Sequence, residues 1–189
     1  ALRPEQGYPA RLVVPGWEGN MWVKWLRRIE VGDEPWHARE ETSKYTDLME
    51  NGKARRFTWV MDTKSVITNP SPQAPVTHGK GPMVLSGLAW SGNGRITRVD
   101  VTVDGGKNWH EARLDGPSLP KALHRFYYEF DWDGSELLLQ SRAYDETGYV
   151  QPTKDALRAV RGTNSIYHNN GIQTWYVKAD GSVENVEIS

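Results

Sequence analysis

The chain has 189 residues, and its 23 basic and 24 acidic side chains give a formal net charge of −1. This balance excludes a chain-wide positive surface of the kind that binds nucleic acid or an anionic membrane. Cysteine is absent, which excludes disulfides, thiolate metal ligands and a cysteine nucleophile within this sequence.

Short β-rich runs bounded by glycine, proline and aspartate recur along the chain, a pattern typical of a mainly β protein. Residues 97–103 show it best, because valines at every second position predict a strand with one buried face. The sequence Asp104-Gly105-Gly106 follows and predicts a hairpin. In chain order, we expect strands at residues 11–14, 23–31, 57–61, 83–90, 97–103, 124–132, 137–144, 172–178 and 183–188, and short helices at residues 40–48 and 155–160.

A proline-rich segment divides the sequence. Residues 70–75 contain three prolines, which a central strand does not accommodate, so we place a boundary within residues 63–82. The downstream part holds short strands at the spacing of a sandwich and has the size of an immunoglobulin-like domain. The upstream part is short for an independent core, which indicates a piece of a larger domain.

Sequence signatures of common catalytic and metal sites are missing. The histidines show no zinc-ligand spacing, and the chain has no nucleophile-elbow, Walker or dinucleotide-binding motif. The adjacent Asp145 and Glu146 would point to opposite faces of a strand. We therefore interpret them as a solvated turn rather than a catalytic pair, and residues 104–109 as a simple turn.

Three segments carry side chains that could take part in chemistry. Between residues 7 and 26, glycines would let backbone N–H groups approach a ligand, and Arg11 and Lys24 would suit a phosphate. Surface charge is the alternative for both. Tyr45 is either a packing aromatic or a functional phenol, and Arg161 is either a surface residue or an anion-binding group.

Several spaced motifs resemble the molybdenum-dependent sulfite oxidase family. Residues 14–31, VPGWEGNMWVKWLRRIEV, resemble its block VPG-x-x-G-x-x-x-VKWL, and residues 87–109, 139–152 and 160–170 resemble later blocks in the same order. Within the family, the stretches EETSKYTDL, LPKALHRF and YHNN look most like the sulfane dehydrogenase molybdenum subunit of bacterial thiosulfate oxidation. The resemblance covers nearly the whole chain.

The resemblance implies a domain organisation. Residues 1–62 would be the C-terminal part of an α+β molybdopterin-binding domain, and residues 63–189 an immunoglobulin-like β-sandwich dimerisation domain. The metal-ligating cysteine of the family would lie upstream, so we expect this chain alone to hold no molybdenum and to be inactive. The complete enzyme would bind molybdenum–molybdopterin, form a homodimer through the C-terminal domain and work in the periplasm.

The same resemblance implies the site residues. The cofactor-contacting positions are Gln6, Arg11, Trp22, Val23 and Lys24, with Gln6 standing where the animal enzymes have histidine. Tyr45 matches the tyrosine beside the metal oxo group, and Arg161 matches a substrate-pocket arginine. No residue of this chain is expected to ligate a metal.

The implied activity is oxidation of sulfane sulfur on a carrier protein. The electrons would pass to a c-type cytochrome subunit, which carries haem c in a heterotetramer. Sulfite oxidation by the same family is one alternative, and a non-catalytic dimerisation module is another. The tryptophans show no regular row, so a carbohydrate-binding sandwich is disfavoured, and no membrane span or nucleic-acid partner is expected.

Overall fold

The computed structural model describes residues 2–34, 36, 38–56, 58–164 and 167–188. Over these residues the chain forms two compact units. The smaller unit comprises Ala1–Met61 and Val160–Asn169, and the larger comprises Asp62–Ala159 and Asn170–Ser189.

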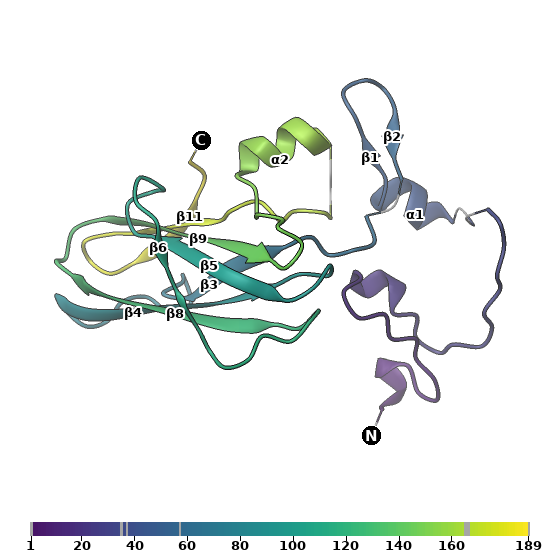
Figure 1. Ribbon diagram of the computed structural model, residues 1–189, viewed down its shortest axis with the longest axis horizontal. Helices are drawn as coiled ribbons and strands as arrows, with labels where there is room; N and C mark the ends of the chain where they lie inside the picture. The colour runs from purple at the N-terminus through teal and green to yellow at the C-terminus, as the bar shows by residue number, and fades with distance from the viewer. Residues whose placement is uncertain (1, 35, 37, 57, 165–166, 189) are drawn as a thin grey trace. The chain divides into compact units, whose positions relative to one another are not determined.

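The larger unit is a sandwich of antiparallel sheets (Figure 1). In the described residues, one sheet has the strand order β11-β10-β9-β5-β6 and the other the order β3-β4-β8-β7. The helix α2 (Lys154–Arg161) lies between β9 and β10 in the chain. The strands are β3 (Lys64–Asn69), β4 (Gly81–Trp90), β5 (Ile96–Thr102), β6 (His110–Glu111), β7 (Arg113–Leu114), β8 (His124–Trp132), β9 (Leu137–Asp145), β10 (Thr174–Val177) and β11 (Val183–Val186).

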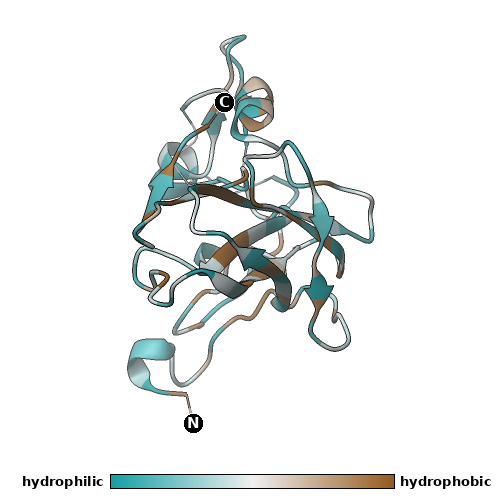
Figure 2. Ribbon diagram, turned by 90° about the vertical axis from the view of Figure 1, so that its left-hand side faces the viewer, coloured by the Kyte–Doolittle hydropathy of each residue, from teal (hydrophilic) through white to brown (hydrophobic). Residues whose placement is uncertain are grey.

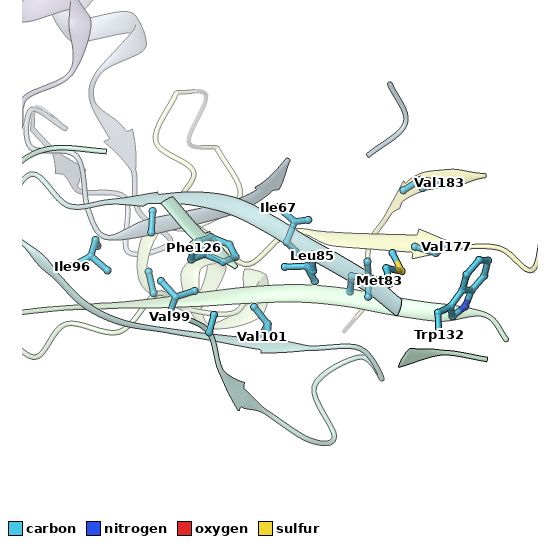
Figure 3. Packing of buried hydrophobic residues seen from close by; sticks show 14 residues of the cluster. Ile67, Met83, Leu85, Ile96, Val99, Val101, Phe126, Trp132, Val177 and Val183 are labelled. Carbon is cyan, nitrogen blue, oxygen red and sulfur yellow. The ribbon is translucent and has the colours of Figure 1, made fainter. Parts of the chain in front are cut away.

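Period-two alternation builds the core of the sandwich. In β4, every second residue from Met83 to Ala89 is buried while the residues that alternate with these are more exposed, as expected for a strand with one inward face. Phe126 of β8 and Val99 of β5 join them in one apolar cluster between the sheets (Figure 3). Figure 2 shows brown, apolar stretches along several of the strands, next to teal, polar positions.

The predicted strands of the sandwich agree with the structure to within a few residues. The strand β8 has the predicted bounds, and α2 extends the predicted helix by one residue at each end. The strand β3 was missed, because the proline-rich segment begins only at Pro70 and leaves Lys64–Asn69 free to pair with β4. The predicted hairpin joins β5 to β6, with residues 103–109 as its loop.

The smaller unit contains little regular structure. Its elements are η1 (Pro4–Gln6), η2 (Gly19–Met21), α1 (Arg39–Lys44), β1 (Asp47–Leu48) and β2 (Ala54–Arg55). Among the described residues, every buried apolar side chain belongs to the larger unit. Aromatic stacking contributes instead, with the rings of Trp17 and Trp59 5.1 Å apart.

Three predicted strands in this unit are wrong. Residues 11–14 and 23–31 form isolated backbone hydrogen bonds, such as Leu12 N–H to the Val23 carbonyl at 2.9 Å, rather than a ladder. In residues 58–61 only Val60 forms a bridge, to Trp17, and Phe57 lies outside the described residues. The predicted helix at residues 40–48 ends at Lys44, because β1 begins at Asp47 and pairs with β2.

Candidate functional site

The cofactor-contacting residues expected from the sequence gather in one part of the smaller unit. Nη1 of Arg11 donates to the Gln6 carbonyl oxygen at 3.1 Å, and the guanidinium carbon lies 5.9 Å from the Trp22 ring centroid. The backbone bond from Leu12 to Val23 joins the two loops. The structure therefore brings Gln6, Arg11, Trp22 and Val23 together.

Lys24 belongs to the same group of residues. Its Nζ donates to the Glu5 carbonyl oxygen at 2.7 Å and lies 5.6 Å from the Trp25 ring centroid. Gly7 permits this approach, because its φ is +109° and an added Cβ would lie 3.0 Å from the Lys24 Cβ. A glycine is needed there for both its backbone conformation and its lack of a side chain. We call Gln6, Arg11, Trp22, Val23 and Lys24 the cationic loop cluster.

The cationic loop cluster has chemistry suited to an anionic ligand. Arg11 and Lys24 direct their hydrogen bonds to backbone carbonyl oxygens rather than to carboxylates in the described part of the chain. Nε of Arg11 is buried and has no hydrogen-bond partner among those residues. A buried donor without an acceptor is unfavourable, so a ligand that supplies an acceptor would stabilise this arrangement. Val23 and Trp25 add exposed apolar surface beside the cations.

Tyr45 and Arg161 are connected through the first residue of β1. Tyr45 follows α1 and stands two residues before Asp47. Arg161 ends α2, and its Nη1 donates to Oδ2 of Asp47 at 3.0 Å. Asp47 could not be identified from the sequence, because its partner is 114 positions away and no local pattern marks the pair.

The phenol of Tyr45 is held in its neutral form. Its ring stacks on that of Tyr167, with centroids 5.1 Å apart and an interplanar angle of 17°. Burial raises the pKa of Tyr45 above its ordinary 10.0, and the charges of Tyr167, Glu18, Glu40 and Glu41 raise it further. At neutral pH the group therefore donates as well as accepts hydrogen bonds.

Gly162 fixes the approach of Arg161 to β1. Its φ is +72°, and an added Cβ would lie 3.2 Å from the Leu48 carbonyl oxygen. A side chain at this position would combine backbone strain with a close contact. Nearby, Nδ1 of the buried His168 lies 3.6 Å from Oε1 of Glu18. Arg161, Gly162 and His168 thus each approach a residue of the segment before residue 61 in the same unit.

Metal-ligand groups are not assembled in the described residues. No three or more histidine, cysteine, aspartate or glutamate side chains lie in a metal-binding arrangement there. His37, one of the five histidines, and Ser165 lie outside the described residues. In the described part of the chain, no helix is long and apolar enough to cross a bilayer.

The interpretation of Asp145 as part of a solvated turn is wrong. Its side chain is buried, with 3% of the residue exposed, and its carboxylate accepts bonds from Thr63 Oγ1 at 2.6 Å and Ser91 Oγ at 2.7 Å. Burial alone would raise its pKa, but hydrogen bonds from Thr147, Thr63 and Ser91 hold the pKa below the ordinary value. Glu146 points outward to Arg95, so the two carboxylates do not form a catalytic pair.

The larger unit contains a pocket of about 390 Å³. Its cationic side chains already bind carboxylates, Arg142 to Asp100 and Lys154 to Glu187, each at 3.1 Å. The guanidinium carbon of Arg142 lies 4.3 Å from the centroid of the Trp109 ring. The positive charges of this pocket are therefore balanced within the fold.

The fold and the matched families define a class of protein, the molybdenum-cofactor oxidoreductases. Residues 55–175 match the model of the Mo-co oxidoreductase dimerisation domain, and residues 1–40 match that of the oxidoreductase molybdopterin binding domain. The first match covers more than half of the chain, so the chain belongs to the Mo-co oxidoreductase dimerisation domain family. The predicted immunoglobulin-like, mainly β fold is confirmed.

Individual relatives agree with this assignment. The chain is 34% identical over 182 residues to a sulfite oxidase of Gallus gallus, covering 86% of this chain and 39% of the relative. It is 33% identical over 180 residues to the NADH nitrate reductase 1 of Arabidopsis thaliana, covering 81% of this chain and 19% of the relative.

A solved structure is similar over the whole chain. The sulfane dehydrogenase SoxCD from Paracoccus pantotrophus has a TM-score of 0.96 and 76% sequence identity, covering 100% of this chain and 49% of that chain. The predicted resemblance to the sulfite oxidase family and its sulfane dehydrogenase branch is confirmed. The chain spans about half of the matched chain of that structure and a smaller share of the two curated relatives.

Proposed function

We propose that this chain is the C-terminal portion of a molybdenum-dependent sulfane dehydrogenase. The complete enzyme would oxidise sulfane sulfur bound to a carrier protein and pass the electrons to a c-type cytochrome. The observation that carries the proposal is the 76% identity, over the whole chain, to a structure named as a sulfane dehydrogenase.

The domain boundary of this proposal lies between residues 62 and 63. Residues 1–62 would complete a molybdopterin-binding domain, and residues 63–189 would form the dimerisation domain. In support, the described part of the smaller unit has no buried apolar side chain, whereas apolar residues including Val23, Trp25, Ile29 and Val31 are exposed. Exposed apolar surface of this kind is usual where another part of a domain packs.

The cationic loop cluster fits a molybdopterin cofactor. Arg11 and Lys24 would hold its anionic groups, and Nε of Arg11 would gain the acceptor that it lacks among the described residues. Gln6, Trp22 and Val23 would flank the ligand. The sequence has no cysteine, so these residues contribute binding rather than the metal ligand. When bound, the group supplies oxygen-atom transfer to sulfur and accepts the two electrons released.

Tyr45 and Arg161 would act beside the reacting sulfur. The neutral phenol of Tyr45 can donate a hydrogen bond to oxygen on the substrate or to water, and its stack on Tyr167 holds the ring. Arg161 would face the substrate while Asp47 fixes its guanidinium. Hydrogen bonding and positioning are therefore the contributions expected of these two residues.

The proposal includes the assembly and its location. The family match supports a homodimer formed through the C-terminal domain. The haem c would belong to a cytochrome subunit in a heterotetramer, the sulfur carrier would be a separate protein, and the enzyme would be periplasmic.

The test is molybdenum content and substrate turnover of the complete protein purified with its cytochrome. We expect about one molybdenum per chain and cytochrome reduction that depends on a carrier-bound sulfane. Turnover of free sulfite with no turnover of the carrier-bound sulfane would favour the sulfite-oxidising alternative. A protein that dimerises but holds no molybdenum would favour the non-catalytic module.

A further inference from the structure

The guanidinium of Arg161 is already neutralised by a buried carboxylate. Its Nη1 lies 3.0 Å from Oδ2 of Asp47, and the exposed side-chain fractions are 11% for Arg161 and 2% for Asp47. Opposite charges at this distance in water-poor surroundings hold each other firmly, and separating them leaves an uncompensated buried charge. Arg161 is therefore poorly available to a free anion.

The backbone on both sides fixes this ion pair. Asp47 begins β1 and stands opposite Arg55 of β2 in the strand register. Gly162, the residue after Arg161, lies against the Leu48 carbonyl oxygen. A shift of either backbone segment would disturb β1 or this close approach.

Other charges near Tyr45 also oppose an anion. After burial, the strongest effects on the pKa of its phenol come from the neighbouring Tyr167 and from the carboxylates of Glu18, Glu40 and Glu41. Oε2 of Glu41 is buried and accepts no hydrogen bond within the described residues. A dianion brought to Tyr45 would meet negative groups, while the cation of Arg161 is balanced by Asp47.

We infer that Asp47 is a specificity-determining positioning residue, which neutralises Arg161 so that the site rejects free oxyanions and accepts sulfur of low charge within a carrier-bound S–S chain. This inference rests on the proposed function, in which Tyr45 and Arg161 flank the reacting sulfur. A free oxyanion would have to displace the Asp47 carboxylate or lie beside it, and both are unfavourable. A carrier-bound sulfur is held by contacts between the surface of the carrier protein and the enzyme. Its terminal sulfur atom therefore needs no cation for binding.

Inorganic sulfate is the probe that tests the inference. In the complete enzyme with its cytochrome, sulfate is titrated as an inhibitor of carrier-bound sulfane oxidation at constant ionic strength. We expect weak inhibition of the wild-type enzyme. Asp47→Asn preserves the shape of the side chain and removes its charge, so the inhibition constant for sulfate should fall about tenfold or more through charge-assisted bonds to Arg161.

Two further variants isolate the cause. In the double variant Asp47→Asn with Arg161→Met, the gain in sulfate binding should disappear, because the released cation is gone. Asp155→Asn is the matched control, since it removes a carboxylate with a side chain that is 62% exposed and is paired only loosely, at 3.5 Å, with Arg158. Its inhibition constant for sulfate should equal that of the wild-type enzyme.

The outcomes separate the inference from the proposed function. Tight, competitive inhibition of the wild-type enzyme by sulfate would overturn the inference. This measurement needs no variant, so the inference can be tested even if the Asp47→Asn enzyme does not assemble. An unchanged inhibition constant in an Asp47→Asn enzyme with full molybdenum content overturns it too. Failure of the wild-type holoenzyme to oxidise carrier-bound sulfane would instead overturn the proposed function.

Discussion

The rings of Tyr45 and Tyr167 stack with their centroids 5.1 Å apart, although the two residues are 122 positions apart in the chain. The stack joins the end of α1 to the segment that follows α2, within the smaller unit. The stack fixes the Tyr45 ring by packing. The hydroxyl is then the group of this side chain that can act on a ligand.

Tyr45→Phe separates these two roles. The variant keeps the ring for stacking and removes the hydroxyl, so we expect the complete enzyme to retain its molybdenum and its melting temperature. Loss of a positioned hydrogen-bond donor should lower kcat for carrier-bound sulfane by about 10²-fold or more. Steady-state kinetics per molybdenum check this, with Tyr127→Phe in β8 as the control. A Tyr45→Phe enzyme with wild-type kcat would remove the hydroxyl from the mechanism.

The sandwich was predictable because burial leaves a pattern in the sequence. In β5, the fully buried Val99 and Val101 alternate in the sequence with polar residues, although Asp100 and Thr102 are buried as well. Each long strand has one face in the core, so period-two alternation marks its position. Turn residues such as Asp104, whose carboxylate accepts bonds from the backbone of Lys107 and Asn108, mark the strand ends.

The smaller unit was less predictable because the same signal is missing. The described residues there bury no apolar side chain, so the apolar runs at residues 11–14 and 23–31 did not indicate strands. The gathering of Arg11 and Lys24 was expected from family resemblance, and their role in cofactor binding stays a prediction. Asp47 was invisible to sequence reasoning, because only the fold brings it to Arg161.

Lys24→Ala should reduce cofactor binding by the complete enzyme. Lys24 supplies one of the two cations in the cationic loop cluster, and its removal weakens the attraction for an anionic group. We expect molybdenum per chain to fall by more than half, measured by elemental analysis beside pterin fluorescence. Lys53→Ala, which removes an exposed lysine of the same unit, is the control. Full molybdenum loading of Lys24→Ala would contradict a cofactor contact at this residue.

Gly162→Ala should disturb the site while sparing the sandwich. The added Cβ would combine a φ of +72° with a 3.2 Å approach to the Leu48 carbonyl oxygen, displacing Arg161 from Asp47. Gly116→Ala is the matched control, because Gly116 has a φ of +75° but open space around it. Both variants should lose about 1–2 kcal/mol of stability from backbone strain. Only Gly162→Ala should also lose activity, and equal activities in the two variants would argue against a constrained Arg161.

Asp100 makes the stability of the sandwich sensitive to acid. Its buried carboxylate accepts two bonds from Arg98, at 2.6 and 2.7 Å, and one each from Arg142 and Tyr144. Burial alone would raise its pKa, but the bonds from Arg98, Tyr144 and Arg142 hold the pKa below the ordinary 3.8. Because the pKa is lower in the folded state, the stabilisation is present above pH 3.8 and is lost as the pH falls through the folded value.

Asp100→Asn should remove that acid sensitivity along with the ion pairs. Removing one partner of a buried charge cluster typically costs about 3 kcal/mol, and the Arg142 guanidinium would lose its carboxylate while remaining against Trp109. Urea unfolding at pH 7 measures the loss, and the same titration between pH 5 and pH 3 measures its pH dependence. The wild-type protein should lose stability more steeply than Asp100→Asn toward the lower pH, because only the wild type protonates this carboxylate. Parallel pH profiles would show that Asp100 is not the group whose protonation unfolds the sandwich.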